Sequence, residues 1–96
     1  MEIKLTPEFK AWLDGLRDAK AQVVIAKRIA RFEAGALGDI KSVGGGVLEA
    51  RIHYGPGYRL YFIIRGDELI IMLIGGDKSL QVRDIERAKE LAKLYQ

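Results

Sequence analysis

Residues 47–75 constrain the fold of this 96-residue chain more than any other segment. Three apolar runs, Val47–Tyr54, Tyr58–Arg65 and Leu69–Gly75, are separated by two short turns. Gly55-Pro56-Gly57 predicts the first turn, because glycine adopts backbone angles that other residues avoid and proline fixes its own. Gly66-Asp67, flanked by apolar runs, is typical of a hairpin. The segment therefore predicts three strands joined by tight reversals.

Alternation along the first two strands predicts which side chains share a face of the sheet. One face is apolar and is expected to form the core: Leu48, Ala50, Ile52, Tyr54, Leu60, Phe62 and Ile64. The other face carries Glu49, Arg51, His53, Arg59 and Tyr61. If Tyr54 pairs with Tyr58, Arg51 lies opposite Tyr61 and His53 opposite Arg59, which is close enough for them to act together. This polar cluster is the best indication of function.

The first residues predict a strand followed by a helix. Met1–Leu5 alternates and is expected to be a short strand. Thr6 is a suitable N-cap and Pro7 suits the first helical position, so a helix is predicted from Pro7 to about Arg17. Its apolar stripe consists of Phe9, Trp12, Leu13 and Leu16. Trp12 is expected in the core.

A second helix is predicted from an N-cap at Asp18 to about Ala34, with Gly35 as a left-handed stop. Its expected buried side consists of Val23, Val24, Ala26, Ile29, Ala30 and Phe32. Its basic residues fall mostly on the other side: Lys20, Lys27, Arg28 and Arg31. Two interpretations remain open for them, a solvated helix face and a stripe that contacts RNA phosphates.

The remaining segments predict a loop and a final helix. Residues 35–46 are glycine-rich and are expected to form a loop with a short extended piece at Ile40–Val43; they do not match a phosphate-binding loop. Leu69–Ile74 is apolar on both faces, as in a central strand, and Gly75-Gly76 is expected to end it. Asp77 or Ser79 is expected to cap a final helix over about 80–94. Its apolar side consists of Ile85, Ala88, Leu91, Ala92 and Tyr95.

Composition limits the class of protein. Ninety-six residues suggest a single domain, 1–96, and the absence of cysteine excludes disulfides and thiolate metal sites. One histidine argues against a structural zinc site. No apolar run is long enough for a membrane span and no signal peptide is recognised, so the expected compartment is the cytoplasm. A net charge of +3 permits nucleic-acid binding without demanding it.

Two motifs resemble the RelE/ParE superfamily of type II toxin–antitoxin toxins. The hairpin LEARIHYGPGYRLYF at 48–62 is similar to the addiction module killer protein branch, and HigB-like toxins are the nearest functional label. GGDKSLQ at 75–81, followed by Asp84, Ile85 and Ala88, is similar too, as is the N-terminal apolar stripe. The resemblance covers nearly the whole chain. It implies an α+β fold, with two N-terminal helices on a curved, largely antiparallel sheet and a C-terminal helix.

The resemblance also implies an activity and partners. Many members are mRNA interferases, endoribonucleases that cut mRNA in the ribosomal A site without a metal or cofactor and leave 2′,3′-cyclic or 3′-phosphate and 5′-hydroxyl ends. The implied partners are the ribosome, mRNA and a cognate antitoxin, a small helix-turn-helix protein that forms a hetero-oligomer with the toxin; no membrane is implied. ParE members instead poison DNA gyrase, so the fold alone leaves the target open.

Metal-free RNA cleavage needs a base for the ribose 2′-hydroxyl, positive charge at the phosphate and an acid for the leaving oxygen. Arg51 and Arg59 are suited to holding a phosphate, and His53 to moving a proton. Tyr61 is a candidate hydrogen-bond donor or base-stacking residue, and Lys78 a second proton-transfer group or phosphate contact. Catalytic candidates are therefore His53, Arg59, Tyr61 and Lys78; RNA-binding candidates are Arg51, Lys27, Arg28 and Arg31; no metal ligand is expected.

Other interpretations of the same residues remain. His53 suits a surface strand residue, and the two arginines suit an exposed face paired with Glu49 or bound to an acidic antitoxin segment. With one histidine in the chain, a two-histidine mechanism is excluded. A gyrase-directed toxin without nuclease chemistry and an inactive interaction partner are the competing functions.

Overall fold

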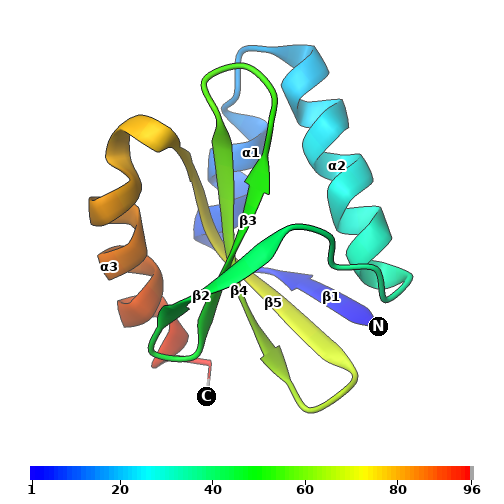
Figure 1. Cartoon of the computed structure of the whole chain (residues 1–96), viewed down its shortest axis with the longest axis vertical. Coiled ribbons are helices and arrows are strands. Elements are labelled where there is room, and N and C mark those ends of the chain that lie inside the picture. The colour runs from blue at the N-terminus through cyan, green and yellow to red at the C-terminus, as the bar shows by residue number, and fades with distance from the viewer. Residues whose placement is uncertain (96) are drawn as a thin grey trace.

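A computed structural model describes residues 1–95 of the chain. One five-stranded sheet lies between helices, and the protein is α+β (Figure 1). The strands are β1 (Glu2–Leu5), β2 (Ile40–Gly44), β3 (Val47–Ile52), β4 (Tyr58–Arg65) and β5 (Leu69–Asp77). The helices are α1 (Pro7–Asp14), α2 (Ala19–Glu33) and α3 (Gln81–Ala92), with a 3₁₀ turn, η1 (Lys78–Leu80), before α3.

The sheet is mixed and its strand order is β1-β5-β4-β3-β2. The pairs β2–β3, β3–β4 and β4–β5 are antiparallel, whereas β1 pairs in parallel with β5. The extended piece expected near residues 40–43 is thus a fifth strand, which pairs with residues 47–50 of β3. The last two residues of β3, Arg51 and Ile52, lie beyond the start of β2 and have no partner in it.

Helices α1 and α2 begin at the residues that the sequence indicates, whereas the predicted cap Asp77 serves the 3₁₀ turn η1 and α3 begins at Gln81 without a side-chain cap. Thr6 Oγ1 accepts a hydrogen bond from the Phe9 amide at 3.0 Å and donates one to the Leu73 carbonyl at 2.6 Å, so this cap also ties α1 to β5. Asp18 caps α2 by accepting from Lys20 and Ala21. Gly35, with φ of 89°, ends α2 as predicted. Helix α1 ends at Asp14, three residues before the predicted end.

Each face of the sheet has its own core. The predicted apolar face packs under α1 and α2, where Phe9, Ile25 and Phe32 meet Leu60 and Phe62. The opposite face is also covered: α3 buries Tyr61, Ile63 and Leu73 against Ala88 and Leu91. The polar cluster of β3 and β4 therefore lies on a face that is partly closed by α3, whereas the alternation alone suggested an open one.

Only part of the predicted apolar side of helix α2 is buried: Phe32 is fully buried, and Val24 and Ile29 pack against the core. Its fully buried residues are Ala21, Ile25 and Phe32. Val23 is 53% exposed, and Ala26 and Ala30 are exposed too. The assignment of these three residues to the buried side was wrong. A helix rich in short apolar side chains has two apolar stripes, and the sheet can cover one of them.

Gly75 and Gly76 lie within β5 and do not end it, contrary to the prediction. A Cβ at Gly75 would overlap the ring of Trp12, and one at Gly76 would overlap the carboxylate of Asp84. The two glycines thus let α1 and α3 approach the strand backbone from opposite faces. Trp12, predicted to be core, is partly buried over Gly75 and packs edge-on to Tyr58.

Candidate functional site

The registry of β3 and β4 places Arg51 directly opposite Arg59. The predicted pairing was shifted by two residues, since Ile52 pairs with Tyr58 and Glu49 with Tyr61. A shift of two keeps every side chain on its predicted face, so the face assignment holds while the partners change. The turn is longer than predicted, because β3 already ends at Ile52. Two like charges directly opposed on one sheet face are destabilising, so their pairing demands an explanation.

Glu49 is fully buried and organises the polar groups around it. Tyr61 Oη donates to its Oε2 at 3.0 Å, and Gln81 Nε2 donates to the same atom at 2.9 Å. Arg51 Nε donates to Oε1 at 3.3 Å, and Lys41 Nζ lies 3.9 Å from that oxygen. Burial alone would raise the pKa of Glu49, but the hydrogen bonds from Gln81, Tyr61 and Arg51 lower it overall. The carboxylate is therefore ionised, and it orients Arg51.

Tyr61 is fully buried, and its pKa is raised, first by burial and then by the charge of Glu49. The phenol is therefore neutral and its proton is committed to Glu49. A ring in this position has no face open for stacking on a nucleotide. Tyr61 thus acts as a positioning residue: it holds the carboxylate that holds Arg51.

Arg59 is 7% exposed and has no carboxylate partner among the described residues. Its Nη1 donates to the carbonyls of Gly57 at 3.2 Å and Tyr58 at 3.3 Å. Its Nε is buried without a hydrogen-bond partner. A buried cation without a counter-charge is costly. Among the described residues, no other fully buried side-chain nitrogen or oxygen lacks a hydrogen-bond partner.

Lys78 and Arg59 both lie beside Gly57 of the hairpin turn. The 3₁₀ turn η1 begins at Lys78, directly after β5, and Asp77 caps it through the amide of Ser79 at 2.8 Å. A Cβ at Gly57 would lie 3.4 Å from Arg59 Nη1 and 3.6 Å from Lys78 Cβ. The hairpin turn between β3 and β4 is thus flanked by Arg59 and by exposed Lys78.

Asp84, which follows the second motif but was not among the predicted site residues, also lies in this region. It is 5% exposed and rests on Gly76, which pairs directly with Arg59. Burial raises its pKa, and Arg83, 3.8 Å away, only partly offsets this. The signal in the sequence was the pair Gly76 and Asp84, because a glycine inside a strand often marks a close approach by another group.

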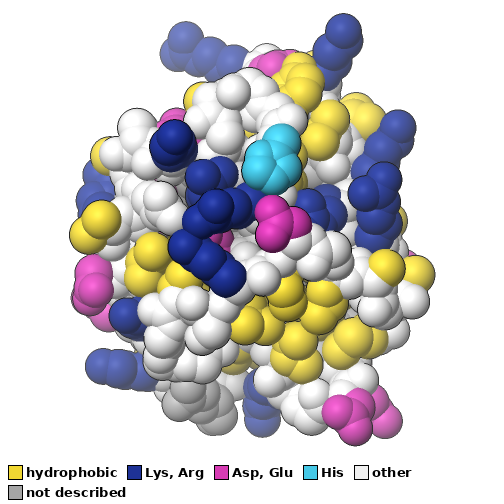
Figure 2. All heavy atoms as spheres, viewed as in Figure 1, with side chains coloured by type: hydrophobic (Ala, Val, Ile, Leu, Met, Phe, Trp, Pro, Cys, Tyr) yellow, Lys and Arg dark blue, Asp and Glu magenta, His cyan; other side chains and the backbone are white. Residues whose placement is uncertain are grey.

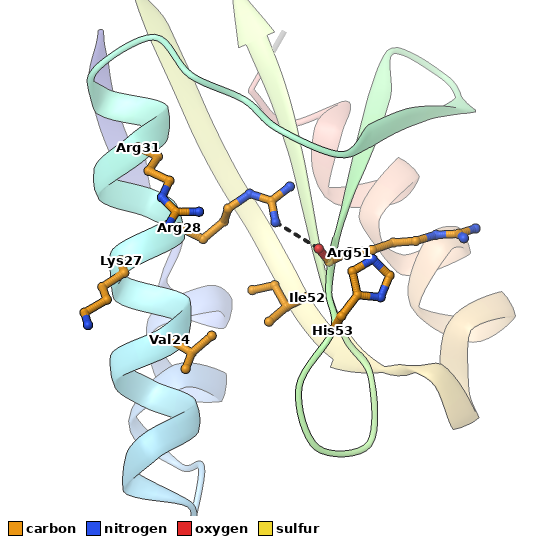
Figure 3. Close-up of a pocket in the computed structure, with 7 residues that line it drawn as sticks. All are labelled: Val24, Lys27, Arg28, Arg31, Arg51, Ile52 and His53. Atoms are coloured by element: carbon orange, nitrogen blue, oxygen red, sulfur yellow. Dashed lines mark hydrogen bonds between the residues drawn. The ribbon is translucent and has the colours of Figure 1, made fainter.

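The other predicted residues lie in a groove between α2 and β3. An open groove of about 330 Å³ is lined by Val24, Lys27, Arg28, Arg31, Arg51, Ile52 and His53 (Figure 3). The side chain of Arg51 leaves this groove and extends away from α2, toward Glu49 (Figure 3). His53 is exposed, and its Nε2 lies 3.3 Å from Asp39 Oδ2. Figure 2 shows the histidine beside a group of basic side chains and one acidic side chain.

Arg28 has a structural task in the same groove. It donates to the carbonyl of Arg51 at 2.9 Å (Figure 3). It also donates to the carbonyls of Asp39 at 3.0 Å and Leu37 at 3.2 Å. These bonds satisfy carbonyls beside the open edge of β3. Lys27 and Arg31 form no ion pair with a described residue and remain exposed. The eight predicted residues are thus divided between two places. Five of them line the groove between α2 and β3, and the other three, Arg59, Tyr61 and Lys78, lie outside it.

Comparison with known proteins adds one relative. An uncharacterized protein of Haemophilus influenzae is 46% identical over 93 residues, which span 97% of this chain and 94% of the relative. The chain belongs to the family of that Haemophilus protein. No family model matches the chain. The similarity thus extends over nearly the full length of both proteins.

Within residues 1–95, no three histidine or acidic side chains are grouped closely enough to hold a metal ion. No helix in the same range is long and apolar enough to cross a bilayer.

Proposed function

We propose that this chain is the toxin of a type II toxin–antitoxin module and a ribosome-dependent mRNA endoribonuclease of the RelE/ParE type. Two motifs in its sequence resemble that superfamily. The mixed sheet, with α1 and α2 on one face and α3 on the other, is compatible with the proposal. The proposed place of action is the cytoplasm, where ribosomes and mRNA occur.

The pairing of Arg51 with Arg59 carries the proposal. Two arginines paired across neighbouring strands are poorly explained by stability when one of them, Arg59, is buried without a carboxylate partner among the described residues. A phosphate near them would supply the missing negative charge, and guanidinium groups donate paired hydrogen bonds to phosphate oxygens. Lys78 would add a third positive charge at the hairpin turn.

The proposed reaction is an internal transfer within RNA. The ribose 2′-oxygen attacks the neighbouring phosphorus, a base takes its proton, and the bond to the 5′-oxygen breaks as that oxygen receives a proton. Arg51 and Arg59 stabilise the charge that grows on the phosphate. His53 is exposed and directly follows β3, the strand that carries Arg51, and it can transfer one of the protons. Glu49 and Tyr61 keep Arg51 in place.

The test is induction of the chain in cells that lack the antitoxin, followed by mapping of new RNA ends. The proposal expects growth arrest and 5′-hydroxyl ends within translated reading frames, both lost in Arg59→Ala. Arg65→Ala is the matched control, because Arg65 is exposed at the far end of the same strand. Intact messages with broken DNA would instead assign the chain to gyrase-directed toxins and refute the nuclease.

A further inference from the structure

A cleft at the end of β5 lies outside the residues that the proposed reaction uses. Its volume is about 320 Å³, and the backbone of residues 74–77 lines it, because β1 pairs with β5 only as far as Met72. Thr6 closes one end of this uncovered edge through hydrogen bonds to the carbonyls of Met72 and Leu73, and the 3₁₀ turn η1 closes the other. The cleft is therefore short and bounded, which suits a compact ligand better than an extended chain.

One wall of the cleft is aromatic. Trp12 and Tyr58 both line it, with ring centroids 6.1 Å apart and planes at 70° to each other. The indole is held against the strand, since a Cβ at Gly75 would overlap its ring. Trp12 is only partly buried, and aromatic side chains bind flat conjugated groups by stacking. This wall therefore suits a planar ligand.

The opposite wall carries a carboxylate that lacks a hydrogen-bond donor. Asp84 is 5% exposed and lines the cleft. No described residue donates a hydrogen bond to it, and its ion-pair partner Arg83 is 3.8 Å away with a side chain that is 72% exposed. A carboxylate buried without a donor is costly. A ligand that brings an N–H group to Asp84 would remove this cost.

The cleft adjoins the arginine pair of the proposed active site. Gly76, on which Asp84 rests, is the β5 partner of Arg59. Pro56, in the turn between β3 and β4, also lines the cleft, and this turn lies at the same end of the sheet as the start of α3 (Figure 1). Directly paired residues of neighbouring strands have Cα atoms about 5 Å apart. A nucleotide whose phosphate contacts Arg59 would therefore have its base within reach of the cleft.

We propose that this cleft binds a nucleobase that bears an exocyclic amine, with the plane of the base against Trp12 and the amine donating to the Asp84 carboxylate. The inference rests on the proposed function, because it places a base of the RNA substrate next to the phosphate that Arg51 and Arg59 hold. Cytosine, adenine and guanine carry such an amine, whereas uracil presents carbonyl oxygens that a carboxylate repels. Asp84 is thereby a specificity-determining residue.

Trp12 is the only tryptophan of the chain, so its fluorescence reports directly on this cleft. The experiment titrates the purified chain with cytidine and with uridine, which differ in one ring substituent, an amine or an oxygen, and which lack a phosphate for Arg59. Cytidine is expected to quench Trp12 at a concentration about tenfold lower than uridine, because it alone donates to the carboxylate.

Two variants test the role of the carboxylate. Asp84→Asn offers both a donor and an acceptor, so it is expected to bind the two nucleosides about equally. Asp67→Asn, at an exposed position in the turn before β5, is the matched control and is expected to keep the preference for cytidine. Circular dichroism verifies that both variants are folded. Equal quenching of the wild-type chain by the two nucleosides, quenching by neither, or an unchanged preference in Asp84→Asn would overturn the base site.

A second measurement separates failure of this inference from failure of the proposed function. In cells, new 5′-hydroxyl ends made by the wild-type chain are expected to lie beside an amine-bearing base, and those made by Asp84→Asn to lie beside uracil as well. Absence of new RNA ends from the wild-type chain would refute the nuclease, while a preference for cytidine would still establish the base site. Ends with the same neighbouring bases in both proteins would overturn the base site and leave the nuclease in place.

Discussion

Arg51 and Arg59 are directly paired across β3 and β4, and of the two only Arg51 has a carboxylate partner among the described residues. Glu49 holds Arg51 at 3.3 Å, while Arg59 is buried with an unsatisfied Nε. The pair is therefore electrostatically incomplete by itself. This asymmetry leads to a prediction that separates stability from function.

Replacement of Arg59 by methionine is expected to leave the free energy of unfolding unchanged or to raise it by up to about 2 kcal/mol. The reason is that an apolar side chain of similar length removes a buried, unpaired charge and its repulsion from Arg51. The same variant is expected to lose growth arrest. Thermal and urea unfolding measure the first effect, and induction in cells measures the second.

Anion binding offers a direct check on the same site. Addition of phosphate is expected to raise the melting temperature of the wild-type protein more than that of Arg59→Met. Arg65→Met controls for general salt effects, because Arg65 is exposed. An equal rise in all three proteins would argue against an anion site at Arg59.

The hydrogen bond from Tyr61 to Glu49 makes a second prediction. Tyr61→Phe is expected to lower the free energy of unfolding by about 1–3 kcal/mol, because a buried charged acceptor loses a donor. Tyr95→Phe, at a partly buried tyrosine on the same side of the sheet, is expected to change it by less than about 0.5 kcal/mol. Chemical denaturation of both variants measures the difference. Equal effects would show that the network around Glu49 adds little.

Asp84 predicts a pH dependence of stability. Burial raises the pKa of Asp84 above its ordinary value of 3.8, so the ionised carboxylate destabilises the fold. This cost is complete above the folded-state pKa and vanishes below the unfolded-state pKa. Asp84→Asn is therefore expected to be more stable than wild type at pH 7, with the difference shrinking as the pH falls toward 3.8.

Glu49 supplies a control of opposite sign for this pH series. Its pKa is lowered, so its ionised form stabilises the fold above the ordinary pKa, and this stability is lost as the pH falls through the folded-state value. Glu49→Gln is accordingly expected to be less stable than wild type at pH 7 and to approach it in acid. Urea unfolding of wild type, Asp84→Asn and Glu49→Gln between about pH 3 and pH 7 checks the direction of both stability changes.

Substitutions at two adjacent basic residues of α2 are expected to have very different effects on the free energy of unfolding. Arg28→Met is expected to lower the free energy of unfolding by about 1–3 kcal/mol, because three backbone carbonyls lose their donor. Lys27→Met is expected to change it by less than about 0.5 kcal/mol, since Lys27 is exposed and unpaired. Thermal unfolding of the two variants tests the assignment of Arg28, and not Lys27, to the fold. A similar loss in both would contradict it.

Several features of the fold followed from local pattern. Thr6, Asp18 and Gly35 end or begin helices as predicted, because caps depend on a few neighbouring residues. The face of each side chain in β3 and β4 also followed, because alternation is a property of the strand itself. The resemblance to toxins and the functions that it implies remain predictions.

The candidate site was only half visible in the sequence. His53, Arg59 and Lys78 were selected by residue type, but the covering of Tyr61 and Glu49 by α3 depends on long-range contacts, such as the Gln81–Glu49 hydrogen bond across 32 residues of chain. The role of Asp84 depends on Gly76, and that of Arg28 on the open edge of β3. Such contacts join segments that no local pattern relates.

The sequence by itself determined where the elements lie, which faces of β3 and β4 are apolar, and how the helices begin, because these depend on short-range geometry. Tertiary structure decided the registry that pairs Arg51 with Arg59, the side of α2 that is buried, and the passage of β5 through Gly75 and Gly76. The physical reason is that registry and helix rotation are set by how whole elements pack together, and alternative packings can satisfy the same local pattern.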